Sequence, residues 1–399
     1  MKTKLMSGWK MMKIADVAIS VSAGGTPRRD KKEYWENGSI NWLKISDMKS
    51  MYISKTEEKI TKLGLENSSA KLFSKDTIVY SIFATLGAIG ILDIESASNQ
   101  AIVGIVPKKE IISTKYLYYC LQAEKNKIID KKSHATQDNL NLNILRNHEI
   151  PVPPIHMQRE IVSILEKAEK AKELRKESDL LTKDLQKSIF FEMFGDPVKN
   201  SKRWKVDKLK NHIDLLTGYP FKSKEYTDDK KEVRLCGGLI IMPYGIEWSK
   251  ANYWKRSLTG GLDRFWLDVG DIVIAMDRPW ISSGFKICQI KEDDVPSLLV
   301  QRTARVRGKN INQNFLFWLL NHKSFEIHAK PTETTVPHIS PKDIQEFEII
   351  LPPLELQNEF SNLVKSIELM KKYQKQSKEQ IENLFNNLMQ KAFKGELAC

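Results

Sequence analysis

The sequence is short of the features that define several large classes of protein. Its 399 residues hold only 4 cysteines, and no two of them form a CxxC pair. That scatter is typical of reduced, structural thiols and excludes a zinc site built on cysteine pairs. No apolar run approaches the roughly 20 residues that a bilayer requires, and the opening MKTKLMSGWKMMK lacks the apolar core of a secretion signal. We therefore expect a cytoplasmic protein with no membrane partner.

The common catalytic motifs are also missing. The sequence contains no GxGxxG or GxxxxGK[ST] nucleotide loop, no HExxH, and no Asn/Asp-Pro-Pro-aromatic tetrapeptide of an amino-methyltransferase. Asp47 with Glu57, Glu58 and Lys59 has roughly the carboxylate–carboxylate–lysine spacing of a metal-dependent nuclease. The surrounding MYISKTEEKI is too polar for the buried strand that such a site needs, so we assign no catalytic and no metal-binding residue.

Charge is present in excess, and it is mostly basic. The formal net charge is +13, with 63 Lys and Arg against 50 Asp and Glu. The excess is larger in residues 1–150 than in residues 204–350. A surface of this kind suits nucleic acid, although a modest basic excess can also serve solubility alone.

The strongest internal signal is a repeat, which indicates one structural unit written twice. Residues 150–162 (IPVPPIHMQREIV) match 349–361 (IILPPLELQNEFS), and 115–121 (KYLYYCL) match 314–320 (NFLFWLL) at the same spacing. Closer to the N-terminus, the spacing shortens by four residues, where 75–81 (KDTIVYS) match 270–276 (GDIVIAM). A short insertion or deletion in a loop accounts for that slip.

Each copy ends in a predicted long helix, because apolar and small residues recur in steps of three and four after Pro-Pro. The first stripe is Ile161, Leu165, Ala168, Ala171, Leu174, Ser178, Leu181, Leu185 and Ile189; the second is Phe360, Val364, Ile367, Met370, Gln374, Ser377, Ile381, Leu384 and Leu388. Gly195 and Pro197 would end the first helix. The two helices could pack separately on their own domains, but we favour an antiparallel pair.

The segments before each helix predict mixed α/β domains. Branched and aromatic runs at 76–83, 88–94 and 101–106 predict strands in the first copy, as do 271–276, 284–290 and 303–308 in the second. A helical run follows in each copy, at 115–127 and 314–328, and then a short strand into Pro-Pro. The predicted domains are 1–150, a long helix 151–196, a second domain 197–350, and a long helix 351–399.

Basic and aromatic side chains in loops are the remaining candidates for function, since Arg can read guanine and Lys mostly meets phosphate. A solvated loop charge is the simpler interpretation of any single one of them. Taken as clusters, they favour DNA contact. The first-copy candidates are Thr26, Arg28, Arg29, Lys31, Lys32, Trp35, Trp42, Lys44, Lys131, Lys132, His134 and Gln137. The second-copy candidates are Lys222, Lys224, Arg234, Tyr244, Lys255, Arg256, Arg264, Arg278, Trp280, Thr332 and Thr334.

The chain resembles the specificity (S) subunit of type I restriction–modification systems over essentially its whole length. The resemblance is carried by SAGGTP followed by YW and INW, HATQDNLN before IPVPP, the MQREI helix opening, the FGDP–KNSKRW junction, and PPLELQNEF closing with AFKGEL. Each motif is short, but their order, twice along one chain, is specific.

The resemblance implies an α+β fold: two α/β target recognition domains in a pseudo-two-fold repeat, separated by two long antiparallel helices that form a coiled coil. Each domain would read one half of a bipartite target in double-stranded DNA. The helices would set the spacer and dock two methyltransferase (M) subunits, and motor/nuclease (R) subunits would join that core. S-adenosylmethionine, ATP and Mg would belong to those partners, so the chain itself would have no cofactor and would not be an enzyme.

The two copies depart from one another where the family's motifs lie. The second copy has LTGYPF in place of SAGGTP, and ETTVPH in place of HATQDN. We therefore expect an asymmetric target. The alternatives are a specificity subunit of a methylation-only or related (type IIB/IIG-like) system, a stand-alone DNA-modifying enzyme, and a pure protein-interaction scaffold.

Overall fold

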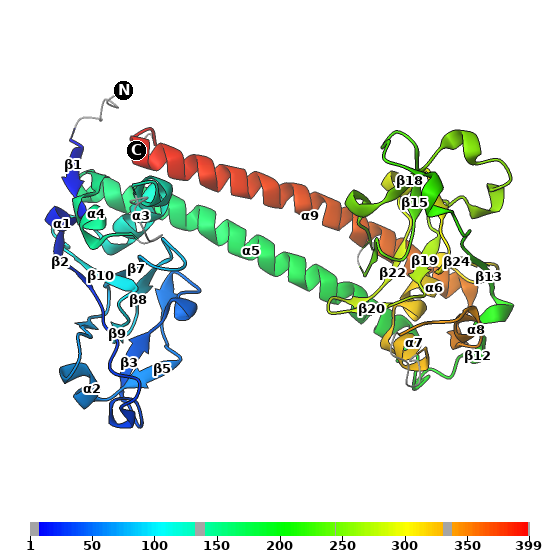
Figure 1. The fold of residues 1–399 in the computed structure, drawn as a ribbon, viewed down its shortest axis with the longest axis horizontal. Coiled ribbons are helices and arrows are strands. Elements are labelled where there is room, and N and C mark those ends of the chain that lie inside the picture. The colour runs from blue at the N-terminus through cyan, green and yellow to red at the C-terminus, as the bar shows by residue number, and fades with distance from the viewer. Residues whose placement is uncertain (1–7, 132–139, 244, 330–336, 398–399) are drawn as a thin grey trace. The chain divides into compact units, whose positions relative to one another are not determined.

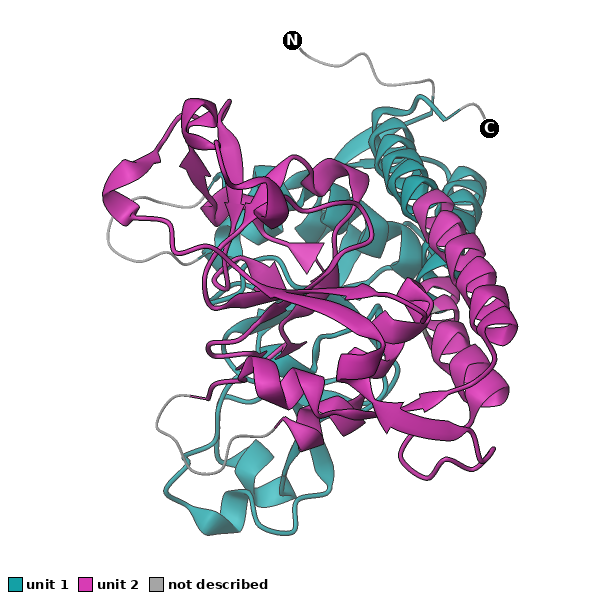
Figure 2. Ribbon diagram, turned by 90° about the vertical axis from the view of Figure 1, so that its right-hand side faces the viewer, with its two compact units in different colours: residues 1–177, 375–399 teal, residues 178–374 magenta. Residues whose placement is uncertain are grey.

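The computed structural model describes residues 8–131, 140–243, 245–329 and 337–397. The chain divides into two compact units: unit 1 is residues 1–177 with 375–399, and unit 2 is residues 178–374. Figure 2 colours the two units separately. Both long helices cross the division, so each unit contains a part of each.

Unit 1 combines a five-stranded, a four-stranded and a two-stranded sheet with short helices (Figure 1). Its strands are β1 (Lys10–Lys13), β2 (Ala18–Ala23), β3 (Ile40–Leu43), β4 (Tyr52–Ile53), β5 (Glu58–Ile60), β6 (Leu72–Phe73), β7 (Ile78–Ser81), β8 (Ile89–Leu92), β9 (Ser96–Ser98), β10 (Ile102–Pro107) and β11 (Glu149–Val152). Its short helices are α1 (Ile14–Val17), α2 (Lys62–Glu66), α3 (Thr114–Ile129) and α4 (Leu142–Asn147). The strands predicted at 76–83, 88–94 and 101–106 are confirmed as β7, β8 and β10.

Unit 2 repeats this plan with additional hairpins. Its strands are β12 (Lys205–Lys208), β13 (Ile213–Thr217), β14 (Tyr226–Thr227), β15 (Val233–Cys236), β16 (Ile241–Met242), β17 (Gly245–Ile246), β18 (Asn252–Trp254), β19 (Ile272–Ala275), β20 (Trp280–Ile281), β21 (Gly284–Phe285), β22 (Ile287–Gln289), β23 (Ser297–Leu299), β24 (Thr303–Gly308) and β25 (Glu348–Leu351). Its short helices are α6 (Gln313–Leu320), α7 (Lys323–His328) and α8 (Pro341–Gln345).

The helical run predicted at 314–328 is wrong in one respect, because it is interrupted between α6 and α7. The Nδ1 atom of His322 accepts the backbone N–H of Ser324 at 3.2 Å and so starts a new helix. Burial lowers the pKa of His322, which favours the neutral imidazole, a form with one ring nitrogen able to accept.

Strand pairing confirms the repeat. In unit 1 the order β2-β10-β7-β8 recurs in unit 2 as β13-β24-β19-β22. The second sheet repeats as well, because β3 pairs in parallel with β9 and antiparallel with β5, and β15 pairs in parallel with β23 and antiparallel with β18. The strand before each long helix pairs with the first strand of its unit, as β1 with β11 and β12 with β25.

Two long helices, α5 (Ile155–Phe194) and α9 (Leu354–Lys394), confirm the helices predicted after Pro-Pro. Each ends at a glycine with positive φ, Gly195 at 75° and Gly395 at 76°, a conformation that glycine adopts without steric cost. None of the described helices is both long and apolar enough to cross a membrane.

A buried glutamine connects the start of each long helix to the N-cap residue of a shorter helix, which is α3 in unit 1 and α6 in unit 2. The Gln158 side chain accepts the Ser113 amide at 2.8 Å and donates to the Pro153 carbonyl at 2.8 Å. In unit 2, Gln357 accepts the Asn312 amide at 2.9 Å and donates to the Pro352 carbonyl at 2.8 Å. The repeated Pro-Pro-x3-Gln therefore has a structural reason, since it fixes how the helix leaves its domain.

Within each unit, the end of one long helix completes the core beside the beginning of the other. In unit 1, Phe393 of α9 lies 5.4 Å from Tyr116, measured between ring centroids. In unit 2, the matching residue Phe194 of α5 lies 4.6 Å from Phe315. The two helix segments run in opposite directions in each unit, as predicted.

The predicted stripe on α5 is wrong over its middle. Leu174 and Leu181 are exposed, whereas Thr182 and Gln186 are buried. In unit 2 the buried contact with α9 is polar: Gln374 donates to Thr182 Oγ1 at 2.7 Å, and Gln186 donates to a carboxylate oxygen of Glu368 at 3.0 Å. Counting apolar residues could not reveal a seam made of amides and hydroxyls.

Candidate nucleic-acid interface

In unit 1 the basic loop after β2 is built around Arg29. Its guanidinium carbon lies 3.7 Å from the ring centroid of Trp35 and 4.7 Å from that of Trp42, and one of its nitrogens pairs with Glu58 at 2.6 Å. The two indoles meet edge to face, with centroids 4.9 Å apart. Stacking and ion pairing together hold this arginine in one orientation, while half of its side chain stays exposed.

Trp42 was predicted to contact DNA, and the structure places it in the core instead. Only 2% of its surface is exposed, and its Nε1 donates to the Gly25 carbonyl at 3.3 Å. Its buried ring therefore packs against the Arg29 guanidinium and helps to fix its orientation. Trp35 is half-buried and donates to the Arg28 carbonyl at 3.1 Å, so it shapes the same loop.

Gly24 and Gly25 are needed for space. A side chain at either position would overlap the backbone of Ser98 or Ser69, and neither glycine has a positive φ. The two glycines therefore allow a close approach of the loop to Ser98 of the second sheet and to Ser69.

The outer basic residues of this loop are exposed and paired with neighbouring acids. Arg28 pairs with Asp30 at 2.6 Å, and that partner raises the pKa of its guanidinium. Lys31 lies 3.4 Å from Glu33, and Lys32 lies 3.8 Å from Glu36. Exposed pairs of this kind contribute little to stability, so a phosphate could replace the acids at little cost.

The acidic residues that resembled a nuclease site serve the same loop. Glu57 and Glu58 both accept from the Lys44 ammonium, at 2.7 and 2.8 Å, and these bonds raise the Lys44 pKa. Asp47 accepts the Lys44 amide at 2.9 Å. Among the described residues, no three His, Cys, Asp or Glu side chains gather where they could hold a metal ion.

Of the remaining unit 1 candidates, Thr26 lies in the same loop, where its hydroxyl donates to Gln100 at 2.5 Å. Lys131 contacts His148 Nδ1 at 3.1 Å, and the other nitrogen of His148 contacts the buried Glu124 at 3.1 Å. Lys132, His134 and Gln137 lie outside the described residues.

In unit 2, Arg234 on β15 resembles Arg29 in that its guanidinium lies against an indole ring. Its guanidinium carbon lies 4.3 Å from the ring centroid of Trp248, and it donates to the Asp293 carbonyl at 2.8 Å. The Trp248 indole donates in turn to Asp294 at 2.7 Å. Unit 2 therefore also presents an arginine whose orientation is fixed by an indole.

Among the described residues, no hydrogen bond, ion pair or cation–π contact joins the other unit 2 candidates to Arg234. Lys222, Lys224, Lys255, Arg256 and Arg264 are exposed. Arg278 is exposed at a positive φ of 45°, with its amide bound to the Pro337 carbonyl at 2.9 Å, and Trp280 packs 5.7 Å from Phe285. Tyr244, Thr332 and Thr334 lie outside the described residues.

Sequence reasoning missed two of the residues that orient these arginines, Glu58 and Trp248. Glu58 was considered only as a metal ligand, and Trp248 was not selected. The signal available for both was their type: a carboxylate or an indole within reach of an isolated loop arginine. The contacts of Glu58 with Arg29 and of Trp248 with Arg234 depend on strand register, which cannot be deduced from the sequence.

Comparison with known proteins gives consistent matches. A family model described as "Type I restriction modification DNA specificity domain" matches residues 6–180 and 202–383. The MjaVIII specificity subunit of a type I restriction enzyme from Methanocaldococcus jannaschii is 27% identical over 330 residues, covering 78% of this chain and 75% of that protein. The MjaIX specificity subunit of the same organism is 24% identical over 388 residues, covering 91% and 88%.

Solved structures share the fold. A chain from a structure of complex assembly and conformational transition of the type I R-M system matches with a TM-score of 0.66 and 18% identity, over 99% of this chain and 100% of that one. The HsdS subunit from Thermoanaerobacter tengcongensis matches with a TM-score of 0.54 and 18% identity, over 99% of each chain. The fold class predicted from the sequence is confirmed.

Proposed function

Because the chain belongs to the family of type I restriction–modification specificity proteins, we propose that it is the DNA-recognition subunit of such a complex. Each unit reads one half of an asymmetric, bipartite sequence in double-stranded DNA. The long helices set the spacer between the half-sites and dock the methyltransferase subunits.

One observation carries this proposal: the two units share a frame and differ in their loops. The strand order and the buried glutamine are the same in both units. The arginine supports differ, with two indoles and Glu58 around Arg29 but a single indole beside Arg234. A shared frame with unequal loops favours two readers of different bases.

The physical division of labour follows from side-chain type. Exposed lysines and arginines contact phosphates and release counterions, which makes binding salt-dependent. Arg29 and Arg234 are already ordered by their aromatic supports, so they lose less freedom when they bind a base edge. We assign base contacts to these two and phosphate contacts to exposed residues such as Arg28, Lys32 and Lys255.

The chemistry belongs to the partners in this proposal. Two methyltransferase subunits carry S-adenosylmethionine, and motor/nuclease subunits carry ATP and Mg, while this chain is non-catalytic and acts with them in the cytoplasm. Exposed apolar side chains on the helix pair of unit 2 support a docking role there, because water-exposed apolar patches favour association. They are Leu181, Leu185, Leu369, Met370 and Tyr373.

The decisive test is the methylated sequence of the host genome with and without this gene. We expect one asymmetric motif, two specified half-sites around an unspecified spacer, to lose its methylation when the gene is deleted. An unchanged methylation pattern would contradict the proposal. Methylation or cleavage of DNA by the pure chain, given labelled S-adenosylmethionine or magnesium, would instead show a stand-alone enzyme.

A further inference from the structure

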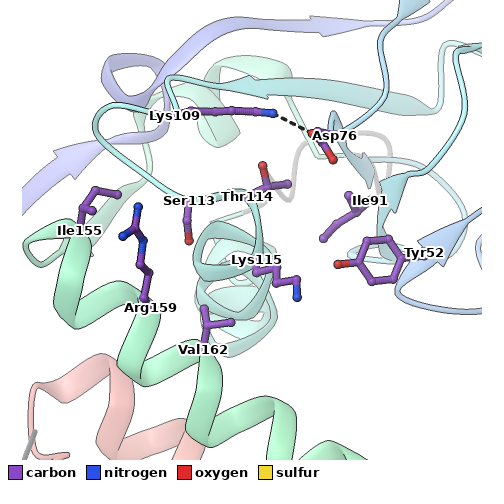
Figure 3. A pocket seen from close by; sticks show the side chains of 10 residues that line it. All are labelled: Tyr52, Asp76, Ile91, Lys109, Ser113, Thr114, Lys115, Ile155, Arg159 and Val162. Atoms are coloured by element: carbon purple, nitrogen blue, oxygen red, sulfur yellow. Dashed lines mark hydrogen bonds and ion pairs between the residues drawn. The ribbon is translucent and has the colours of Figure 1, made fainter.

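A pocket of about 370 Å³ opens in unit 1 between the start of α3, the first turns of α5 and the edge strand β4 (Figure 3). Apolar and cationic groups share its lining. The residues that decide its chemistry are Tyr52, Ile91, Lys115, Ile155, Arg159 and Val162. It lies on the shared frame of the repeat and is built from different residues than the basic loop around Arg29.

Within the described part of the chain, the charges around this pocket leave one cation, Arg159, without an acidic partner. Lys109 pairs with Asp76 at 2.7 Å, and Lys115 pairs with Glu166 of α5. Arg159 is exposed, and within the described part of the chain no acidic group pairs with it. In Figure 3 its guanidinium points toward Ser113, where α3 begins.

The start of α3 adds to the same field. Ser113 caps this 16-residue helix, its hydroxyl accepting the Tyr116 amide at 3.2 Å. The positive end of the helix dipole therefore faces the pocket beside the free guanidinium, a combination that favours a negative group. A planar carboxylate can take two parallel hydrogen bonds from such a guanidinium.

Unit 2 lacks this chemistry at the matching positions. Ser113, Lys115 and Arg159 are replaced by Asn312, Asn314 and Asn358 in the repeat. Those amides bind within the unit, since Asn312 donates to Asn358 at 2.9 Å and Asn314 donates to Ser361 at 2.7 Å. The same frame thus carries a cationic pocket in one copy and a closed, neutral network in the other.

We propose that the pocket in unit 1 binds a carboxylate on an acidic, partly apolar segment of a partner protein, and that unit 2 has no equivalent site. The proposal rests on the proposed function, in which the chain assembles with other proteins. A DNA backbone fits less well, because the pocket has apolar walls of Ile91, Ile155 and Val162. Two identical partner subunits would then bind units 1 and 2 differently, because only unit 1 offers this contact.

The first experiment measures binding of a labelled probe to the full chain by fluorescence anisotropy. The probe is a capped hexapeptide with one glutamate between leucines, and its control carries glutamine there. We expect Arg159→Asn, which copies Asn358, to weaken the glutamate peptide about tenfold, as loss of a charge-assisted hydrogen bond does. Arg159→Lys should lose less affinity for the glutamate peptide, because lysine keeps the positive charge and lacks only the two parallel N–H donors of the guanidinium.

The matched control is Lys167→Asn, which removes one exposed charge from α5 outside the pocket lining. Equal binding of the two peptides, or equal weakening by the Lys167 and Arg159 changes, would overturn the proposal. Displacement of the peptide by a short DNA duplex, lost in Arg159→Asn, would overturn it in favour of phosphate.

The second experiment places a photo-crosslinking amino acid at Tyr52, whose hydroxyl points into the pocket in Figure 3, in the assembled complex. A crosslink to an acidic segment of a partner, absent in Arg159→Asn, supports the proposal; crosslinks to DNA alone, or none, contradict it. The peptide measurement needs neither target DNA nor methylation. Its failure is therefore separate from any failure of the recognition function.

Discussion

At the scale of single residues, Arg29 shows what the sequence could and could not predict. Its type and its place in a glycine-rich loop marked it as a DNA contact. Its orientation depends on Trp42 and Glu58, which come from β3 and β5, and these strands pair antiparallel with Trp42 opposite Glu58. Register of that kind brings distant residues together and is invisible in spacing along the chain.

Arg28→Ala combined with Arg29→Ala should weaken DNA binding by the assembled methyltransferase at least about tenfold, since an arginine contact contributes roughly 1–3 kcal/mol. The fold should survive, because Arg28 is exposed and half of the Arg29 side chain is exposed. Gel-shift titration and circular dichroism measure the two effects. Lys62→Ala with Lys71→Ala, which removes two exposed charges of unit 1 outside the loop, is the control; an equal loss there would deny the loop any special role.

Lys286 gives a prediction of pH dependence. It is 6% exposed and donates to the Gly238 carbonyl, and burial lowers its pKa against the opposing charge of Asp277. Because its folded pKa lies below the ordinary lysine value of 10.5, the unfolded chain binds more protons between these two values, and stability rises with pH across that window. Below the window the burial penalty is fully present.

Lys286→Met should therefore raise the free energy of unfolding relative to the parent most strongly at neutral pH. The difference should shrink as the pH approaches 10.5. Urea unfolding at pH 7, 8.5 and 10 measures this. Lys230→Met, at an exposed loop lysine, should show a constant difference. A constant difference for Lys286→Met as well would mean that its ammonium is not held at a lowered pKa.

At the scale of elements, the long helices were predicted more accurately than the faces they bury. Pro-Pro, the stepped apolar residues and Gly195 were sufficient for the ends of α5. The seam was not, because Thr182, Gln186 and Gln374 bury hydrogen-bonded polar groups and leave leucines such as Leu181 exposed. Buried polar pairs of this type fix register between helices at some cost in stability.

The glutamine that begins each long helix can be tested directly. Gln158→Leu leaves the Ser113 amide and the Ile111 and Pro153 carbonyls without their partner, whereas Gln357→Leu affects the Asn312 amide and the Pro352 carbonyl. Leaving a buried polar group unsatisfied costs roughly 1–3 kcal/mol. We expect about 2 kcal/mol or more in each unit.

Hydrogen exchange followed by mass spectrometry locates the effect. Gln158→Leu should speed exchange at the start of α3 by roughly thirtyfold, and Gln357→Leu should do the same at the start of α6. Gln376→Leu, at an exposed position of α9, should change neither. Uniform faster exchange across both units after either substitution would argue against a local tie.

At the scale of the whole molecule, the repeat was the most reliable signal in the sequence. The matches 75–81 with 270–276 and 115–121 with 314–320 became β7 with β19 and α3 with α6. The compact units could not be predicted, because unit 1 draws residues 375–399 from the far end of the chain. The pairing that creates them depends on long-range contacts such as Tyr116 with Phe393.

Shortening both long helices by matched turns should change the spacing of the methylated half-sites. Removing residues 171–177 and 375–381 takes seven residues from each helix, about 10 Å of rise, or roughly 3 base pairs of DNA. Methylome sequencing reads the new spacing. Removing only one of the two segments should abolish methylation, because the contacts between the helices lose their register. An unchanged spacing in the matched variant would show that the helices do not set the distance between half-sites.

The discontinuity of unit 1 also has a consequence for biosynthesis. Its core includes Leu165 of α5 together with Phe385, Met389 and Ala392 of α9. A ribosome adds roughly 5–20 residues per second, so roughly 10 to 45 s pass between the synthesis of Leu165 and that of Ala392. Unit 2 is contiguous and can close during that interval. Unit 1 therefore cannot complete this core until the last turns of α9 have left the ribosome.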